Sequence, residues 1–469
     1  MTNQFSDFDA TGLAELVRTR KASPQELAED TIRKIESINP TVNAIVHKTY
    51  DRARMRATTQ PTHGIFAGVP WLLKDISEAE GVPMTLGSRA MRGNVSQVSV
   101  PFVEATETAG LNILGVTNVP EFGLTESSEN VLYGPTRNPW SLSHSAGGSS
   151  GGAAAAVAAG IVPMAHGNDG GGSLRIPASH CGLFTLKPSR GRTLSAHAHD
   201  YPFGIAYDGA ISRSVRDNAR LMSIVESRES GLPPLGFVEG PSDRKLTIGL
   251  LLDLGNGVPL DAEVAAAIVC TAKLCENLGH RVEPVSLPFE FESFTEAFMS
   301  IWMSMAALTV DSIAALAGPL TLSDHFEAWT LGLREETLSR GGATALLQAA
   351  APVVESCSEK LDLLLQTYDV VLSPVCQGRV PSLGLRELNA STSYTQLKRR
   401  LMNYASFTPI HNACGTPAMS VPLGWDSEGL PIGSQFFARK GQEATLLGLA
   451  YELEAAQPWS HRRPTHFVC

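Results

Sequence analysis

Two glycine-rich segments that contain serine, and one lysine that follows an apolar run, are the residues of this chain best suited to chemistry. The segments are GGSSGG at 147–152 and DGGGS at 169–173, and the lysine is Lys74. Successive glycines can turn the backbone tightly and point several N–H groups into one concavity, which holds an anion without a charged side chain. A tetrahedral acyl-transfer intermediate carries its negative charge on an oxygen that such a concavity stabilises. The pattern therefore predicts nucleophilic attack on a carbonyl carbon.

Ser173, at the end of the second segment, is the predicted nucleophile. A serine hydroxyl reacts slowly unless a base takes its proton. None of the 12 histidines lies in either glycine-serine segment, so we assign the base to Lys74, whose pKa would be lowered by burial behind the apolar residues 71–73. Ser149 can accept one hydrogen bond while it donates another, so it can pass the proton between Lys74 and Ser173.

Each of these features taken alone also has an ordinary structural explanation. Glycine-serine turns are common in loops, and most lysines are solvated. The GGSSGG segment lacks the Gly-Lys-Ser/Thr ending of a phosphate-binding loop, which excludes that use. The catalytic interpretation depends on the three features occurring together.

The segment from residue 134 to residue 192 closely resembles the amidase signature. The two serines of that family are 24 positions apart, and here 173 − 149 = 24. The family's lysine lies in a Val-Pro-x-x-x-Lys-Asp context, which residues 69–75 match. Similarity extends over nearly the whole chain, apart from about residues 220–400, where the match is loose.

The resemblance implies a role for each residue of the site. Ser173 would be the nucleophile, Ser149 a bridging serine in a cis peptide bond, and Lys74 the base. Backbone N–H groups of Gly170, Gly171, Gly172 and Ser173 would form the oxyanion hole. Gly170 is a departure, because many members carry Thr, Ile or Ala there, and it affects the expected shape of the acyl side. The implied reaction uses no metal and no organic cofactor.

The implied fold is α/β, with 1–469 forming a single large α/β/α domain around a mixed, twisted central sheet. The alternation of helical and strand patterns supports this class. A capping box at 23–26 predicts a helix to about residue 37. The alanine-rich stretch 147–162 is apolar on every side and predicts a buried helix. Residues of about 290–350 are mostly helical and interrupt the alternation, so we expect an insertion or lid near the active site.

The remaining expected elements follow from hydrophobic patterns and from glycine or proline stops. We expect strands at 69–73, 111–116, 245–252, 281–287, 369–375, 419–422 and 433–438, and helices at 101–109, 261–277 and 442–456.

Composition restricts the partners. The chain has 37 Lys+Arg against 47 Asp+Glu and a net charge of −10, which makes nucleic acid a poor partner. The N-terminus lacks a signal-peptide pattern, and the longest apolar run, 153–159, is too short to span a bilayer, so we expect no membrane partner. Seven cysteines without a zinc-site spacing indicate free thiols and a cytoplasmic location. A small-molecule amide is the expected partner, and the sequence leaves a homodimer open.

Residues in three places are candidates for substrate contact. Thr125 and Ser127 lie in a loop that borders the site in similar proteins. Trp302 shares one helical face with Phe294, Phe298 and other apolar residues, which is typical of core packing but would also suit an acyl pocket for bulky or aryl groups. The motif HGNDGGGS is closest to the branch with aryl-acylamidases and 6-aminohexanoate-cyclic-dimer hydrolases. We therefore predict hydrolysis of a non-peptide carbon–nitrogen bond, in a hydrophobic or aryl secondary amide or a lactam.

Three alternatives remain at the level of sequence. A glutaminase subunit of a tRNA-dependent amidotransferase resembles the same family, although Ile176-Pro177 stands where those subunits usually carry Gln-Pro. An esterase or acyl transferase would use the same three residues. A catalytically inactive binding protein is disfavoured because all three residues are present.

Overall fold

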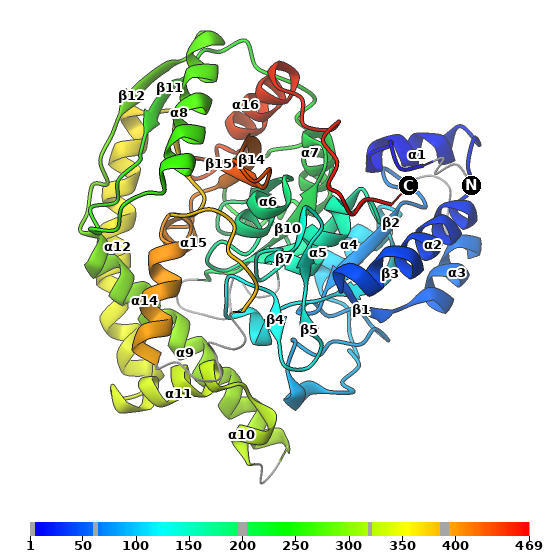
Figure 1. Ribbon diagram of the computed structural model, residues 1–469, viewed down its shortest axis with the longest axis horizontal. Helices are drawn as coiled ribbons and strands as arrows, with labels where there is room; N and C mark the ends of the chain where they lie inside the picture. Colours follow the sequence, from blue (N-terminus) through cyan, green and yellow to red (C-terminus); the bar gives the residue numbers. More distant parts are fainter. Residues whose placement is uncertain (1–4, 60–63, 196–203, 318–320, 385–393, 469) are drawn as a thin grey trace.

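The computed structural model describes residues 5–59, 64–195, 204–317, 321–384 and 394–468, and its architecture is α/β (Figure 1). The large central sheet has eight strands: β8 (Met164–Asp169), β9 (Phe184–Lys187), β10 (Tyr207–Ser212), β11 (Thr247–Leu250), β12 (Arg281–Pro284), β13 (Val370–Pro374), β14 (Ala418–Trp425) and β15 (Pro431–Ala438). A smaller sheet contains β1 (Ile45–Lys48), β2 (Pro70–Lys74) and β3 (Asn112–Thr117).

The sheet is mixed, as the sequence predicted. Its strand order is β12-β11-β13-β15-β14-β9-β10-β8. Strand β11 pairs in parallel with β12 and β13, whereas every other neighbouring pair in this sheet is antiparallel. In the smaller sheet the order is β1-β3-β2, and β2 packs against β8. The end of β2 and the end of β8 therefore meet where the two sheets adjoin.

Helices cover both faces of the large sheet and both ends of the molecule. The longer ones are α1 (Ala10–Arg18), α2 (Pro24–Val42), α3 (Tyr50–Thr59), α4 (Pro101–Thr108), α5 (Gly151–Ala158), α6 (Arg175–Cys181), α7 (Val215–Val225), α8 (Ala262–Asn277), α9 (Phe291–Ala317), α11 (Ala328–Ser339), α12 (Ala343–Thr367), α14 (Tyr394–Tyr404) and α16 (Glu443–Ala456). Two short helices are α10 (Leu322–His325) and α15 (Pro409–Ala413). Figure 1 shows α1, α2 and α3 at one end, beside the small sheet, and α9, α11 and α12 at the other.

Strand β13 illustrates how the sheet is buried on both faces. Side chains alternate along a strand, so neighbouring residues face opposite layers. Val370 and Leu372 pack in the cluster that contains α7, α8 and α16. Val371 packs in the cluster that contains α9 and α12. A strand covered on both faces needs apolar residues at every position, which explains why 369–375 was recognisable in the sequence.

Helix α2 begins at the predicted capping box. The Ser23 hydroxyl accepts a hydrogen bond from the Glu26 N–H, and the Glu26 carboxylate accepts one from the Ser23 N–H. The helix runs to Val42 rather than to about residue 37, and it includes Pro40 in its last turn. It ends at Asn43, which adopts a left-handed backbone conformation.

Helix α5 is buried at every residue, as its composition predicted. It begins at Gly151, because residues 147–150 form the loop that carries the first serine segment. A Cβ atom on Gly152 would lie 2.4 Å from the Asn118 N atom and 2.6 Å from the Ala44 O atom. Glycine at this position therefore lets the start of α5 press against the backbone beside β3, which fixes the loop before it.

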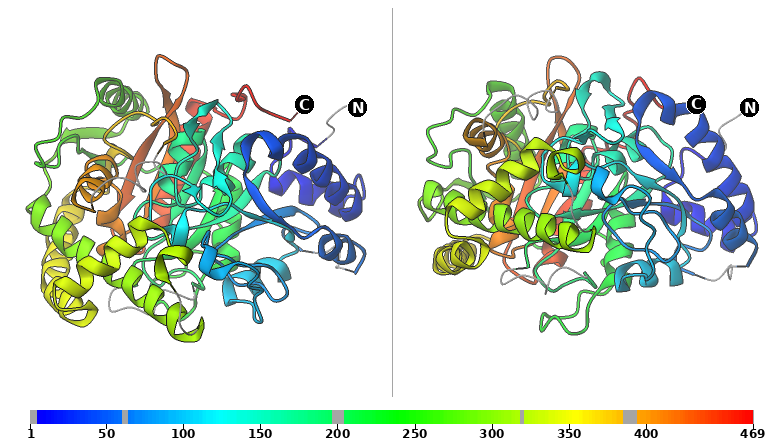
Figure 2. Two further views of the ribbon diagram at one scale, coloured as in Figure 1. Left: turned by 60° about the horizontal axis from the view of Figure 1, so that its bottom comes forward. Right: turned by 90° about the horizontal axis from the view of Figure 1, so that it is seen from below.

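The helical region from α9 to α12 extends further than the expected 290–350, because α12 continues to Thr367. In both views of Figure 2 these yellow-green helices lie together, away from the blue N-terminal helices. Residues 291–316 of α9 are apolar and long enough to cross a membrane by length and composition alone, a test that core helices of soluble proteins also pass. Helix α9 packs along α11 and α12, as a core helix does.

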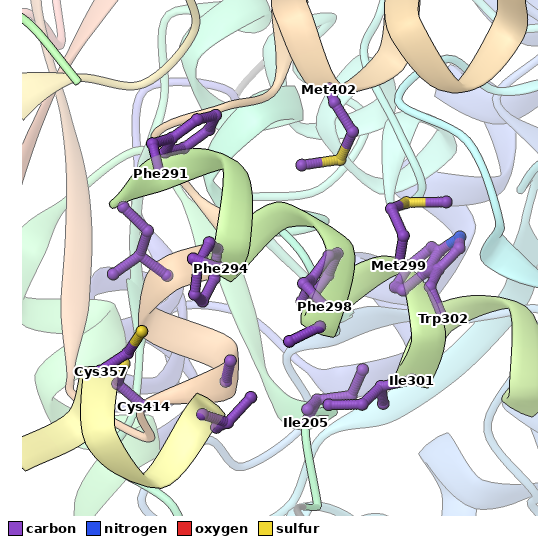
Figure 3. Packing of buried hydrophobic residues seen from close by; sticks show 14 of the residues in the cluster. Ile205, Phe291, Phe294, Phe298, Met299, Ile301, Trp302, Cys357, Met402 and Cys414 are labelled. Carbon is purple, nitrogen blue, oxygen red and sulfur yellow. The ribbon is translucent and has the colours of Figure 1, made fainter. Parts of the chain in front are cut away.

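One face of α9 carries a column of aromatic rings. The ring centroids of Phe294 and Phe298 are 6.1 Å apart, and those of Phe298 and Trp302 are 5.6 Å apart, both in stacked geometry. Figure 3 shows these side chains following one another along the helix. The column belongs to the largest buried cluster, and its last two members also face the site described next.

Candidate active site

Lys74 is the last residue of β2 and is fully buried. Its Nζ atom lies 2.7 Å from the Ser149 Oγ atom, 2.6 Å from the Asn168 Oδ1 atom and 3.3 Å from the Asn168 O atom. A neutral amine has two N–H donors and one lone pair. Two bonds donated to Asn168 use both donors, which leaves the lone pair for the Ser149 hydroxyl proton. The geometry accommodates an uncharged lysine that acts as a base, and it also accommodates the ammonium form, which would donate to all three oxygens.

The electrostatic setting of Lys74 favours the uncharged form. Burial lowers the pKa of its amine to about 7, because the ammonium form loses its hydration. The negative charges of Asp169 and Asp208 raise that pKa, but by less than burial lowers it. Neither carboxylate forms an ion pair with the amine among the described contacts. A base with a pKa near neutrality is well matched to proton transfer at the pH of most cells.

His166 connects Lys74 to Asp208. The Lys74 backbone N–H donates to His166 Nδ1 at 3.2 Å, so Nδ1 is the unprotonated ring nitrogen. The proton is then on Nε2, which lies 3.2 Å from Asp208 Oδ1 and donates to it. The other Asp208 oxygen accepts from the Ser195 hydroxyl at 2.6 Å. This chain orients the end of β2 without touching the amine itself.

The first serine loop is held by backbone contacts. The peptide bond between Gly148 and Ser149 is cis. Ser128 donates from its hydroxyl to the carbonyl oxygens of Gly147 and Ser149, at 3.1 and 3.2 Å. The Ser150 N–H donates to the Ser173 carbonyl oxygen at 3.2 Å, which ties the first loop directly to the second. The two predicted serine loops are therefore neighbours in space.

A buried ion pair supports the second loop, which follows β8. The Arg175 guanidinium donates to both carboxylate oxygens of Asp169, each at 2.9 Å, and both side chains are inaccessible to solvent. Burial alone would raise the pKa of the Asp169 carboxyl, but the charge and hydrogen bonds of Arg175 outweigh it and hold that pKa well below its usual range. Asp169 remains ionised and can fix the backbone that follows it.

The amide of Gly172 differs from its predicted role. Its N–H donates to Asp169 Oδ1 at 2.6 Å, so it is already engaged and does not point at a reacting oxygen. The N–H groups of Gly170, Gly171 and Ser173 have no acceptor among the described residues. These three amides are the ones left to serve as oxyanion donors. The prediction was wrong at Gly172 because a run of glycines in the sequence does not show which of their N–H groups donates to a neighbouring carboxylate.

Gly172 instead has a structural requirement for glycine. Its φ is +129°, and a Cβ atom there would lie 2.3 Å from the Thr408 Oγ1 atom. Thr408 in turn donates to the Gly171 carbonyl oxygen at 2.7 Å. The loop therefore turns where only glycine fits, and the segment around α15 holds it in that conformation.

A narrow pocket, partly open to solvent, lies beside Ser173. Its apolar walls come from α9, α14 and nearby segments, and include Phe298, Trp302, Leu401, Ala405 and Ile176. A Cβ atom on Gly170 would lie 3.5 Å from the Trp302 ring, so α9 covers the glycine loop closely.

The three predicted substrate contacts have different positions. Thr125 and Trp302 line the pocket. Ser127 does not line it: the Ser127 hydroxyl donates to Glu129 at 2.7 Å and shares a 2.7 Å hydrogen bond with the Ser145 hydroxyl. These two hydrogen bonds hold the Ser127 side chain away from the pocket.

Sequence reasoning did not identify Asn168, His166 or Asp208. The first two belong to β8, whose sequence MAHGND lacks the apolar pattern of a buried strand. The sequence signal that could have found them is alternation, since residues 164, 166 and 168 share one face of a strand. No group of three or more His, Cys, Asp or Glu side chains within the described ranges is arranged to hold a metal ion.

Comparison with known proteins finds relatives that are similar to this chain in sequence and in fold. The family description Amidase matches residues 26–447. The chain is 36% identical to the 6-aminohexanoate-cyclic-dimer hydrolase of Pseudomonas sp. (strain NK87), with 97% of this chain and 96% of that protein covered. A structure of 6-aminohexanoate cyclic dimer hydrolase complexed with substrate superimposes with a TM-score of 0.90 and 33% identity, over 99% and 100% of the two chains. The structure of a bacterial aryl acylamidase gives a TM-score of 0.85 and 28% identity, over 97% of each chain.

Proposed function

The chain belongs to the amidase signature family, an amide-hydrolysing family, and from this premise we propose that it cleaves its substrate through an acyl-enzyme on Ser173, with Lys74 as the base and Ser149 as the proton relay. The observation that carries the proposal is the buried Lys74 amine, which lies 2.7 Å from the Ser149 hydroxyl and has a pKa of about 7. An exposed, permanently charged lysine could not accept that proton at neutral pH.

In the first half of the cycle, neutral Lys74 takes the Ser149 proton while Ser149 takes the proton of Ser173. The Ser173 oxygen forms a bond to the amide carbon, and the carbonyl electron pair moves to the oxygen. The free N–H groups of the glycine loop stabilise that charge. As the electron pair returns, the carbon–nitrogen bond breaks and the amine leaves with the proton from the relay.

In the second half, water repeats the same steps. The relay removes a proton from water, and the oxygen of water attacks the ester carbon. The bond to Ser173 breaks, the relay returns a proton to its oxygen, and the carboxylic acid product leaves. Lys74 ends each half as the neutral amine with which it began.

We further propose that the substrates are hydrophobic or aryl secondary amides, or lactams. The aromatic wall formed by Phe298 and Trp302 beside Ser173 supports this class, because it offers flat apolar area to an acyl group. The names of the related cyclic-dimer hydrolase and aryl acylamidase support it as well. Ile176 adds hydrocarbon to the same wall.

A cytoplasmic enzyme acting on a small-molecule amide is the setting we propose. The six described cysteines are all free, five of them buried, which is consistent with a reducing compartment.

The test is a hydrolysis screen on the purified chain alone. Anilides, lactams, primary amides, esters and free glutamine would be compared, with Ser173→Ala as the inactive variant and Ser339→Ala, at an exposed site on α11, as the matched control. We expect turnover of anilides or lactams that Ser173→Ala abolishes and Ser339→Ala retains. Turnover of glutamine alone, or equal activity in Ser173→Ala, would contradict the proposal.

A further inference from the structure

A buried carboxyl group without a full set of partners lies in the wall of the pocket beside Ser173. Glu126 lines the pocket, only 7% of the residue is exposed, and its Oε2 atom has no hydrogen-bond partner among the described residues. Leaving a buried polar atom unpaired costs a protein stability, so an unpartnered carboxylate oxygen in a residue that lines a pocket calls for an explanation, and a ligand in the pocket would supply one.

Glu121 shows what a buried structural carboxylate looks like in this protein. Its two oxygens accept from the Ser88 hydroxyl, the Glu327 N–H and the Thr330 hydroxyl, at 2.7, 2.8 and 2.5 Å. Glu121 is 3% exposed and does not line the pocket. The protein therefore pairs a buried glutamate completely where its role is to hold segments together, and Glu126 differs from that pattern.

The position of Glu126 relative to the nucleophile is fixed. A Cβ atom on Gly148 would lie 2.6 Å from the Thr125 O atom and 2.7 Å from the Glu126 C atom. The backbone of Glu126 is thus packed directly against the residue that precedes Ser149. A group held by Glu126 would keep a constant distance from Ser173, as selection of a substrate by length requires.

The surroundings of the carboxyl are mostly apolar. Ile176, Leu401 and Ala405 line the same pocket as Ser173 and Glu126 and supply hydrocarbon to its wall. Burial raises the pKa of Glu126, Arg400 opposes that shift and Glu129 adds to it. A substrate N–H or O–H that donates to Oε2 would supply the hydrogen bond that this oxygen lacks, in either protonation state of the carboxyl, because Oε2 can accept a hydrogen bond.

We infer that Glu126 is a specificity-determining residue, which selects amides whose acyl group carries an amino or hydroxyl group at the end of a hydrocarbon segment. The acyl group is the half of the substrate that stays bonded to Ser173, so it is the half that the adjoining pocket must hold. The hydrocarbon segment lies along the apolar wall, and the terminal donor binds Oε2. This inference rests on the proposed function, since it concerns substrates of the same serine.

The experiment compares 4-nitroanilides whose acyl chains have about four to eight carbons and end in an amino, a hydroxyl or a methyl group. The measurement is the ratio of kcat/KM for the donor-ended anilide to that for the methyl-ended anilide of matching length. In the natural protein we expect the best-fitting donor to be preferred by about tenfold or more, because a site built for a donor leaves its acceptor unpaired when the donor is missing.

Variants separate charge from hydrogen bonding. Glu126→Gln should keep a preference for the hydroxyl and lose the preference for the amino group, because the carboxamide has no charge. Glu126→Leu should abolish both preferences. Glu104→Gln is the matched control: this glutamate is exposed on α4 and does not line the pocket, so both ratios should be unchanged.

Each result has a distinct meaning. Hydrolysis of all the anilides with ratios near one in the natural protein would overturn the inference and leave the proposed function intact. No hydrolysis of any anilide, together with no labelling of Ser173 by a fluorophosphonate, would overturn both. The ratios in the natural protein decide the matter even where a Glu126 variant fails to fold.

Discussion

The reactivity of Ser173 should follow the ionisation of Lys74, and this can be measured without knowing the substrate. Burial brings the pKa of Lys74 from 10.5 to about 7. At pH 7 roughly half of the molecules would then hold a neutral amine, against about 0.03% for a lysine with an ordinary pKa. The protein thus gains roughly a thousandfold in available base, equivalent to about 4 kcal/mol.

The assay is the rate of labelling of Ser173 by a fluorophosphonate between about pH 5 and 10. The base works only when deprotonated, so the rate should fall about tenfold for each pH unit below 7 and level off above it. Lys74→Met should label at least roughly a hundredfold more slowly at pH 8, with no inflection near 7. A natural protein whose rate keeps rising to pH 10, or a Lys74→Met variant that labels normally, would refute the assignment of the base.

Further predictions concern stability, the glycine loop, the supporting carboxylate and the aromatic wall. Unfolded protein binds more protons at Lys74 than folded protein between pH 7 and 10.5, so stability should rise with pH across that window. The stability gained in Lys74→Met should therefore be largest below pH 7, fall between pH 7 and 10.5, and vanish above about 10.5, as followed by urea unfolding. Gly170→Ala should keep most of its anilide turnover, since its Cβ would lie 3.5 Å from the nearest ring atom, whereas Gly172→Ala, at φ +129°, should lose soluble protein or at least roughly tenfold in activity. Asp208→Asn should move the inflection of the labelling profile below pH 7, because the carboxylate favours the ammonium form; an unchanged profile would argue against this electrostatic link. Trp302→Ala should lower kcat/KM for aryl acyl groups by roughly tenfold more than for acetyl groups, and equal losses would place the ring outside the acyl site.

The residues proposed to react could be singled out in the sequence because local chemistry defines them. Lys74 ends a continuous apolar strand, and Ser149 and Ser173 stand in glycine-rich turns, so both the residue type and the backbone requirement can be read without a neighbour. The parallel and antiparallel strands with strong apolar runs, such as β13 and β14, were recognisable for the same reason. Strand β14 still proved longer than expected, because its pairing with β15 continues to Trp425.

Alternation along β8 could have placed His166 and Asn168 on one face, but the roles of the supporting residues were not predictable, since these depend on partners far away in the chain. Asn168 and His166 contact Lys74 only because β8 lies against β2, and the segment MAHGND by itself does not indicate that contact. The engagement of Gly172 with Asp169 depends on the conformation of one turn. In the sequence Glu126 is indistinguishable from an exposed loop glutamate, and only the fold places it in a pocket with residues of α9 and α14.

The aromatic column of α9 has a consequence for how this protein could acquire new substrates. The three residues proposed to react, Lys74, Ser149 and Ser173, all lie in the first 173 residues, whereas the aromatic wall is formed by Phe298 and Trp302 on α9, to which the proposal assigns no reacting atom. Substitutions confined to α9 and α14 would therefore change substrate selection and leave Lys74, Ser149 and Ser173 unaltered. Because the pocket wall and the residues proposed to react lie in different segments, this fold could gain activity on new amides through changes in α9 and α14 alone.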